Sequence, residues 1–351
     1  MQSLFYSVGL LATIILSIAN AKPLAKPSAP SLPLAVTELR SFGDKTWAEN
    51  IAVRSNGQLL VTRLDSPILQ LLDPTNKTAP ITLHTFNTTT YIGLLGITEI
   101  VPKSDIFYVA LQTPYTPVFT KTTNYSNAIF KVDLNTFSSK AGSLTSNPRV
   151  SHTIDIPESV FLNGIDTLDP EHILITDSTL GHVYNLDIST ISYTTPLKLA
   201  SMAIPPDAVA QLGINGIHYR PPYLYFDNLG ASTLNRVPIA PTTALPTGDG
   251  ELLVSVPNPD DFVIREDGTI FICGNAQDTL FMWKEGMSEV VAVAGSNTST
   301  ILAGVTAGAF ERVRGREGKR LWLTTSGAQA QPINGTIITG ATVLYVDTEG
   351  I

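Results

Sequence analysis

A short hairpin pattern that recurs along the chain constrains the fold more than any other feature. In its clearest copy, a strand that opens at Glu49 ends in Asn56-Gly57, and an apolar run, 59–61, follows. Asn and Gly both tolerate positive φ, so this pair predicts a tight hairpin turn. The segment 259–272 repeats the design, and looser copies begin near positions 95, 163, 215 and 303. Six similar hairpins indicate a repeated architecture.

Further predicted strands follow each hairpin, which gives about four strands per repeat. They are 50–55, 58–64, 67–72 and 81–86; 96–101, 106–112, 128–134 and 150–156; 164–168, 172–177, 181–187 and 192–199; 216–220, 223–227, 233–239 and 251–256; 262–266, 269–273, 279–284 and 288–294; and 304–311, 320–325 and 342–347. The last repeat is one strand short, and a lone strand at 36–42 precedes the first.

A ring in which this lone strand completes the last repeat leaves no exposed sheet edge. We therefore predict an all-β, six-bladed β-propeller that spans 36–351 as a single domain and is closed by its N-terminal strand. A pair of β-sandwiches is the main alternative, and it does not account for six similar hairpins.

The first residues predict export from the cytosol. Leu4 to Ala19 is almost wholly apolar, and Ala19-Asn20-Ala21 is a small-x-small cleavage site, so 1–21 is expected to be a signal peptide of a secreted or secretory-pathway protein. A membrane anchor is the alternative, but the stretch is short for a full span. Residues 22–35 are rich in Pro, Ser and Ala, which predicts a flexible lead-in.

Five Asn-x-Ser/Thr sequons agree with passage through the secretory pathway and predict glycosylated surface positions. They are Asn76, Asn87, Asn124, Asn297 and Asn334.

Composition narrows the function. A net charge of −8 and the lack of any basic run argue against a nucleic-acid partner. No segment after the signal peptide is expected to cross a membrane. Cys273 is the single cysteine, so no internal disulfide can form and stability must come from packing. We expect Cys273 to be a small core residue.

Oxygen-bearing side chains open most of the hairpin copies. In a propeller the first strand of each blade lines the central channel, so these residues should converge at one mouth. Two carboxylates and two amides meeting there would suit a hard cation such as Ca²⁺, or the carboxyl groups would act as acid and base if their pKa values differ. The alternative is that each side chain satisfies a local turn. The aligned positions are Glu49, Leu95, Asn163, Asn215, Asp260 and Ala303.

Two further side chains are candidates for the channel. His218 lies on the first strand of the fourth blade and is expected to point inward by alternation from Gly216, although a structural histidine is the alternative. Trp47 either caps the mouth or packs between the first and last blades. The remaining histidines show no metal-binding spacing, and no G-x-S-x-G elbow or dinucleotide fingerprint occurs.

At these residues the sequence resembles the gluconolactonase/senescence-marker propeller superfamily. The resemblance implies a divalent cation held by Glu49, Asn163, Asn215 and Asp260. Two motifs depart from the superfamily: its Glu-Gly-Pro is Glu-Asn-Ile here, and its Arg-x-Asn-Asp-Gly becomes Phe-Leu-Asn-Gly-Ile at 161–165, which lacks the sugar-lactone arginine.

A closer resemblance is to a fungal secreted branch of that superfamily. It rests on Trp-x-Glu-Asn-Ile-Ala-Val-Arg at 47–54 and on Leu-Val-Thr-Arg at 60–63. The branch includes the hetero-Diels–Alderases of tropolone–sesquiterpenoid biosynthesis, so the resemblance implies small hydrophobic substrates and a cycloaddition that requires no cofactor.

Three hypotheses for the function follow. A pericyclase would join a tropolone quinone methide to a humulene-type alkene in a dry cavity, with Glu49, Asn50, Asn215, Asp260 and His218 as its polar groups. A Ca²⁺-dependent lactonase or esterase would use the ion to polarise a carbonyl. A secreted binding propeller would have no catalytic role. The missing arginine favours the first.

Overall fold

The computed structural model describes residues 31–75, 78–116, 119–140 and 142–351. The predicted signal peptide, most of the predicted lead-in and Asn76 lie outside these residues. Among the described residues of the lead-in, Leu34 is buried, and its N–H donates to the carbonyl of Val293 at 2.7 Å. The chain is therefore fixed to the fifth blade before its first strand begins.

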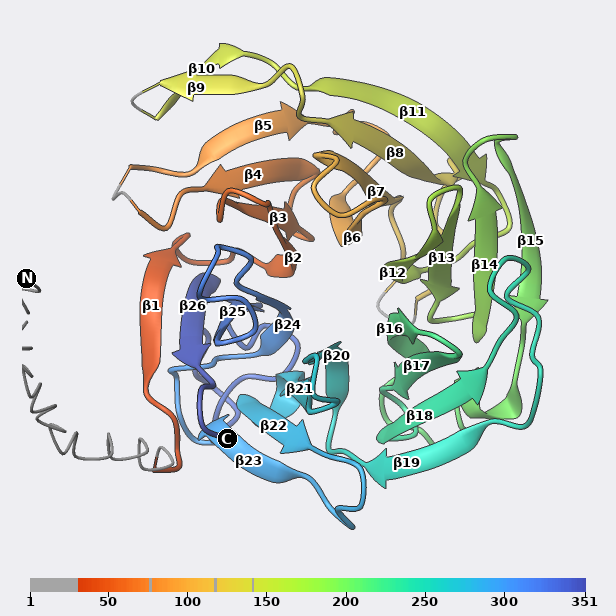
Figure 1. Cartoon of the computed structure of the whole chain (residues 1–351), viewed down its shortest axis with the longest axis vertical. Helices are drawn as coiled ribbons and strands as arrows, with labels where there is room; N and C mark the ends of the chain where they lie inside the picture. Colours follow the sequence, from red (N-terminus) through yellow and green to blue (C-terminus); the bar gives the residue numbers. More distant parts are fainter. Residues whose placement is uncertain (1–30, 76–77, 117–118, 141) are drawn as a thin grey trace, which may run out of the picture.

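Six four-stranded antiparallel sheets stand in a ring around a central channel (Figure 1). They are β2 (Ala48–Val53), β3 (Leu59–Arg63), β4 (Ile68–Leu72) and β5 (Ile81–Thr85); β6 (Gly93–Glu99), β7 (Ile106–Gln112), β8 (Asn127–Asp133) and β11 (Arg149–Ile156); β12 (Leu162–Asp169), β13 (His172–Asp177), β14 (His182–Asp187) and β15 (Ser192–Leu197); β16 (Ile214–Arg220), β17 (Tyr223–Asn228), β18 (Thr233–Pro238) and β19 (Glu251–Ser255); β20 (Pro259–Ile264), β21 (Ile270–Gly274), β22 (Thr279–Trp283) and β23 (Val291–Gly295); and β24 (Val305–Phe310), β25 (Arg320–Thr325), β26 (Thr342–Asp347) and β1 (Val36–Ser41).

The predicted closure is confirmed. The first strand, β1, pairs antiparallel with the last, β26, so that Val36 lies opposite Val346 and completes the sixth blade (Figure 1). This pairing covers an edge of the sixth sheet that would otherwise expose unpaired backbone groups. The all-β, six-bladed propeller predicted from the sequence is therefore the fold of this chain.

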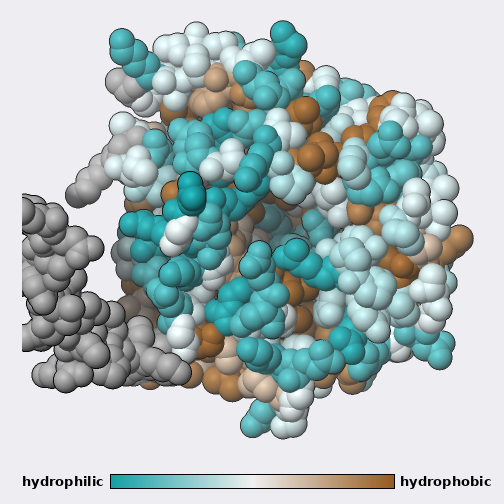
Figure 2. Space-filling model, in the orientation of Figure 1, coloured by the Kyte–Doolittle hydropathy of each residue, from teal (hydrophilic) through white to brown (hydrophobic). Residues whose placement is uncertain are grey.

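The core lies between the faces of neighbouring blades. The second strands β3 and β21 are buried at every residue, because both faces of a blade pack against other blades. Trp322 and Trp283 are buried in these layers, as is Cys273. Figure 2 shows that one face of the molecule is mostly hydrophilic, with smaller hydrophobic areas between.

Three local features were not predicted. A hairpin of β9 (Ser138–Lys140) and β10 (Ser143–Ser146) forms a separate two-stranded sheet beside β5 of the first blade, in a stretch for which no strand is predicted. Two single-turn 3₁₀ helices are η1 (Ala200–Met202) and η2 (Asn275–Gln277). In the part of the chain that the structure describes, no helix is long and apolar enough to cross a membrane.

Each innermost strand carries a β-bulge at the same height. The pairing register shifts in β2 between Ala48 and Ile51, and the equivalent shift recurs in β6, β12, β16, β20 and β24. A bulge sets two consecutive residues against one partner, so both can face the same side of the sheet. The bulge in β24 falls between Val305 and Gly308, which makes Thr306 the equivalent of Glu49; the alignment on Ala303 was therefore wrong by three residues.

Candidate active site

Glycines bring the innermost strands close together halfway along the channel. A Cβ atom on Gly164 would lie 2.5 Å from the carbonyl oxygen of Asn215, and one on Gly96 would lie 2.4 Å from that of Asn163. Both distances are too short for any residue other than glycine. This waist has a cavity on each side, which we call the upper chamber, lined by Glu49 and Asp260, and the lower chamber, lined by His218 and Asp261.

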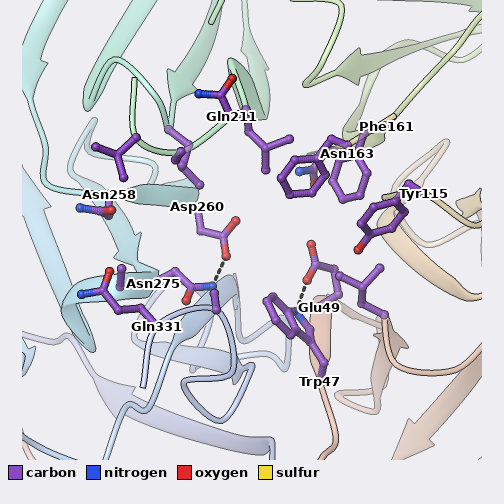
Figure 3. A pocket seen from close by; sticks show the side chains of 18 residues that line it. Trp47, Glu49, Tyr115, Phe161, Asn163, Gln211, Asn258, Asp260, Asn275 and Gln331 are labelled. Atoms are coloured by element: carbon purple, nitrogen blue, oxygen red, sulfur yellow. Dashed lines mark hydrogen bonds between the residues drawn. The ribbon is translucent and has the colours of Figure 1, made fainter. Parts of the chain in front are cut away.

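The upper chamber has a volume of about 350 Å³ and two contrasting walls. On one side, the carboxyl groups of Glu49 and Asp260 face one another (Figure 3). On the other, Tyr115 stacks on Phe119 with a centroid separation of 5.4 Å. The centroid of each of these rings lies 5.0 Å from the centroid of Phe161, in a T-shaped arrangement. The chamber therefore combines an acid pair with an aromatic wall.

Hydrogen-bond donors hold both carboxyl groups in place. Asp260 accepts from the Asn215 amide at 2.9 Å and from the Asn275 amide at 2.6 Å, one bond to each oxygen. The indole N–H of Trp47 donates to Glu49. Glu49 and Asp260 are 7% and 9% exposed, so these bonds satisfy carboxyl groups that water barely reaches.

Burial shifts the protonation of both acids. It raises the pKa of Glu49 well above its usual value; the nearby Asp260 carboxylate raises it further, and the Trp47 hydrogen bond opposes the shift. Burial also raises the pKa of Asp260 to about 7, against the hydrogen bonds from Asn275 and Asn215. Two close acids in a dry site resist carrying two negative charges, so the pair holds a proton near neutral pH.

The predicted residues divide between the two chambers. Glu49 and Asn163 line the upper chamber with Asp260. Asn215 is 1% exposed beneath the chamber and reaches it through its bond to Asp260. Trp47 lines the mouth, as one of its two predicted roles required.

Asn50 and His218 lie in the lower chamber, away from the acid pair. The Asn50 amide donates to Asp261 at 3.0 Å. The His218 ring stands 3.6 Å from Asp166 on one side and 3.6 Å from Asp261 on the other. Burial lowers the pKa of His218, but the two carboxylates more than offset this and raise it to about 10. His218 is therefore the cation of an ion triad that lines the lower chamber.

The bulge explains this division. Glu49 and Asn50 are consecutive, as are Asp260 and Asp261, and in each pair the first residue lines the upper chamber and the second the lower. The extra backbone N–H of Asn50 is satisfied by the Thr62 hydroxyl at 2.9 Å, and that of Gly216 by Asp227 at 2.7 Å.

The upper chamber contains oxygen ligands of the kind that calcium prefers, but N–H donors already occupy most of them. Three of the four carboxyl oxygens of Glu49 and Asp260 accept bonds from Trp47, Asn215 or Asn275. Within the described ranges, no three His, Cys, Asp or Glu side chains are arranged to hold a metal ion. Each of these oxygens keeps a second lone pair, but the N–H donors weaken the negative charge that would attract a cation, so the arrangement fits a proton better than Ca²⁺.

Asn275 and the aromatic wall were missed by the sequence reasoning. Asn275 follows β21 in a polar run, 275–278, which was a usable signal because it ends the strand beside Asp260. Tyr115 and Phe119 come from an insertion in the second blade that carried no repeat pattern, so nothing placed them at the channel.

The described sequon asparagines lie on the surface, as glycosylation requires. Asn87, Asn124, Asn297 and Asn334 are all exposed in turns or loops. Their modification, and secretion itself, stay predictions.

The class of protein that the six sheets define is a β-propeller, and solved structures share this fold. A luciferin-regenerating enzyme superposes with a TM-score of 0.65 at 13% identity, covering 90% of this chain and 96% of that one. Regucalcin from Agrobacterium tumefaciens, a calcium-binding protein, gives 0.59 at 14% identity over 90% and 94%. These likenesses show the fold alone.

Sequence comparison is more specific. No protein-family model matches the chain. A Phoma sp. protein named "Putative hetero-Diels-Alderase" is 27% identical over 258 residues, which span 67% of this chain and 70% of that protein.

Proposed function

We propose that the protein is a pericyclase that catalyses an intermolecular hetero-Diels–Alder reaction in its upper chamber. The observation that carries the proposal is the pairing of a buried, proton-holding acid pair, Glu49 and Asp260, with an apolar aromatic wall. The likeness to the Phoma protein supports the same reaction class. The substrates we propose are a tropolone quinone methide and a humulene-type sesquiterpene.

The aromatic wall supplies orientation. Tyr115, Phe119 and Phe161 offer flat apolar surfaces against which a ring and a hydrocarbon can be held face to face. Holding two reactants in a near-attack arrangement converts a bimolecular reaction into an effectively unimolecular one. The volume of about 350 Å³ is at the lower end of the about 300–1,000 Å³ of small-molecule pockets, so the two reactants would fill it.

The acid pair supplies polarisation. A protonated carboxyl group donates a hydrogen bond to the quinone methide oxygen, and the charge that gathers on that oxygen in the transition state strengthens the bond. The Asn163 amide makes no hydrogen bond to another described residue and lines the same chamber, so it is a second candidate donor.

The reaction needs no net proton transfer. The oxadiene of the quinone methide and the alkene form one C–O and one C–C single bond while two π bonds are lost and one moves. All atoms of both reactants remain in the product. The pair would also assist formation of the quinone methide from a hydroxymethyl precursor: the protonated carboxyl group gives its proton to the departing hydroxyl group, which leaves as water, and the other carboxylate takes the proton of the ring hydroxyl group, so the pair ends with the same number of protons.

Product analysis tests the proposal. Purified protein is incubated with the quinone methide precursor and humulene, and the cycloadducts are separated on a chiral column. We expect one stereoisomer to dominate, and Glu49→Ala to slow its formation by about 100-fold because an electrostatic donor is lost. Glu251→Ala, on the exposed edge strand β19, is the control. An unchanged rate and isomer ratio with wild-type protein would remove the hypothesis.

A Ca²⁺-dependent hydrolase is the second candidate, because the chamber gathers two carboxyl groups and the Asn163 amide in a fold shared with a calcium-binding propeller. A calcium chelator distinguishes the two candidate reactions. Hydrolysis of a lactone or ester should stop when a calcium chelator is added, whereas cycloaddition should continue.

A further inference from the structure

A loop at the rim of the upper chamber exposes an apolar side chain to water. Val209 is 100% exposed, yet it lines the chamber together with Gln211 and Leu212. The loop joins η1 to β16, the strand that carries Asn215. A valine wholly in water contributes no burial to the fold, and at the entrance of the chamber this one is placed where a bound ligand could contact it.

The loop is fixed at its two ends and nearly free between them. At one end the Asn228 amide donates to the carbonyl of Ala203 at 2.8 Å, and at the other the N–H of Gly213 donates to Ser178 at 2.6 Å. Residues 204–211 make two hydrogen bonds to described parts of the chain, and both stay inside the loop: Ala208 to Pro205 and Gln211 to Ala208. Segments with so few bonds to the body open most easily.

The loop also has space on both sides. The upper chamber lies on one side, and a second hollow of about 450 Å³ lies on the other, between Asp207 and Ala208 of the loop and the turn 229–232 that follows β17. Both hollows share Val209 and Ala210 in their linings. The segment can therefore move as a unit without first breaking a packed core.

We propose that residues 204–211 form a flap that folds over the upper chamber when an apolar ligand binds, with Val209 as the residue that selects the hydrocarbon partner. The ligand class rests on the proposed function. Closure transfers Val209 from water onto the ligand, and this transfer is favourable when the ligand surface is itself apolar. The closed flap also excludes water from Glu49 and Asp260.

Thiol labelling measures closure without relying on catalysis. In Val209→Cys, the new thiol is exposed, while the native Cys273 is 1% exposed and should react slowly. The rate of labelling by a water-soluble maleimide is measured with and without humulene. Fluorescence of Trp47, which lines the chamber, reports binding independently. Leu252→Cys on β19, where the leucine is 59% exposed, is the matched control.

We expect humulene to change the Trp47 fluorescence and to slow labelling of Val209→Cys by about fivefold or more, while Leu252→Cys is unaffected. A fluorescence change with unaltered labelling would overturn the flap and leave the proposed function standing. Slowed labelling in a protein that forms no cycloadduct would support the flap and overturn the function. No change in either signal would overturn the flap together with the hydrocarbon substrate.

A second variant separates selection from closure. Val209→Asp should raise the KM for humulene by about tenfold with little change in kcat, because a charged side chain cannot be moved onto a hydrocarbon without losing its hydration. Val209→Leu should restore the wild-type KM. Equal KM values in all three proteins would show that Val209 does not select the hydrocarbon.

Discussion

Single side chains in the upper chamber owe their chemistry to the donors around them. Asp260 receives one amide hydrogen bond on each oxygen, and Glu49 receives the Trp47 indole on one oxygen, which leaves its other oxygen directed to the cavity. In the coupled pair, Glu49 is therefore the group best placed to carry the proton to a substrate.

Glutamine at position 49 imitates the protonated acid. Its carbonyl oxygen can accept from Trp47 while its N–H₂ group faces the chamber. In the wild type, the rate should fall by about tenfold per pH unit above the upper pKa of the pair, as the last proton leaves. We expect Glu49→Gln to keep most of the activity at pH 6 and to lose this alkaline decline. A pH–rate profile checks this, and an unchanged decline in Glu49→Gln would show that the proton resides elsewhere.

At the level of strands, the bulges decide which residues meet. The hairpin turns at Asn56-Gly57 and Asp267-Gly268 were visible in the sequence, and β3 and β21 follow them as predicted. The bulges carry no such signal, because they arise from pairing with the second strand rather than from local residue preference. For this reason Glu49 and Asn50 were assigned to one site, although the structure puts them on opposite sides of the waist.

The lack of a local sequence signal also explains the other differences between the predicted and the observed site. A repeat pattern identifies strands that recur, so it located the strands that contain Asn163, Asn215 and Asp260. It gives no information on insertions, and Tyr115 belongs to one. In the sixth copy the sequence pattern aligns on Gly304, which precedes β24, and therefore points to Ala303 in place of Thr306.

One hydroxyl group supports the bulge of β2. The Thr62 oxygen accepts from the backbone N–H of Asn50 and is fully buried. Thr62→Val keeps the shape but leaves that N–H without an acceptor, so the free energy of unfolding should fall by about 1–3 kcal/mol. Urea denaturation measures it. Thr82→Val, at an exposed position of β5, should change stability by less than about 0.5 kcal/mol. Equal effects of the two substitutions would contradict the role of Thr62.

At the scale of the whole molecule, the buried charges near the axis make stability depend on pH. Asp260 has its pKa raised from 3.8 to about 7, so the folded state binds more protons than the unfolded state between these values. His218 has its pKa raised from 6.5 to about 10, which gives the folded state extra protons in that range too. Where the folded state binds more protons, stability falls as the pH rises.

We therefore expect the melting temperature to fall from pH 5 to pH 9, by about 5 °C or more. Asp260→Asn should flatten the change below pH 7, and His218→Gln should flatten it above pH 7. Differential scanning calorimetry at matched ionic strength gives these curves. A melting temperature that rises over this range would mean that other groups dominate.

The pairing of β1 with β26 has a consequence for how the protein is made. Ribosomes synthesise β1 first, yet its strand partner in the described chain is the final one, β26. The nascent polypeptide therefore carries β1 without its partner while the blades assemble in sequence, and the circle stays open until β26 has been synthesised. Closure of the ring is thus a late step in folding, and the edge of β1 is open to pairing with other chains until then.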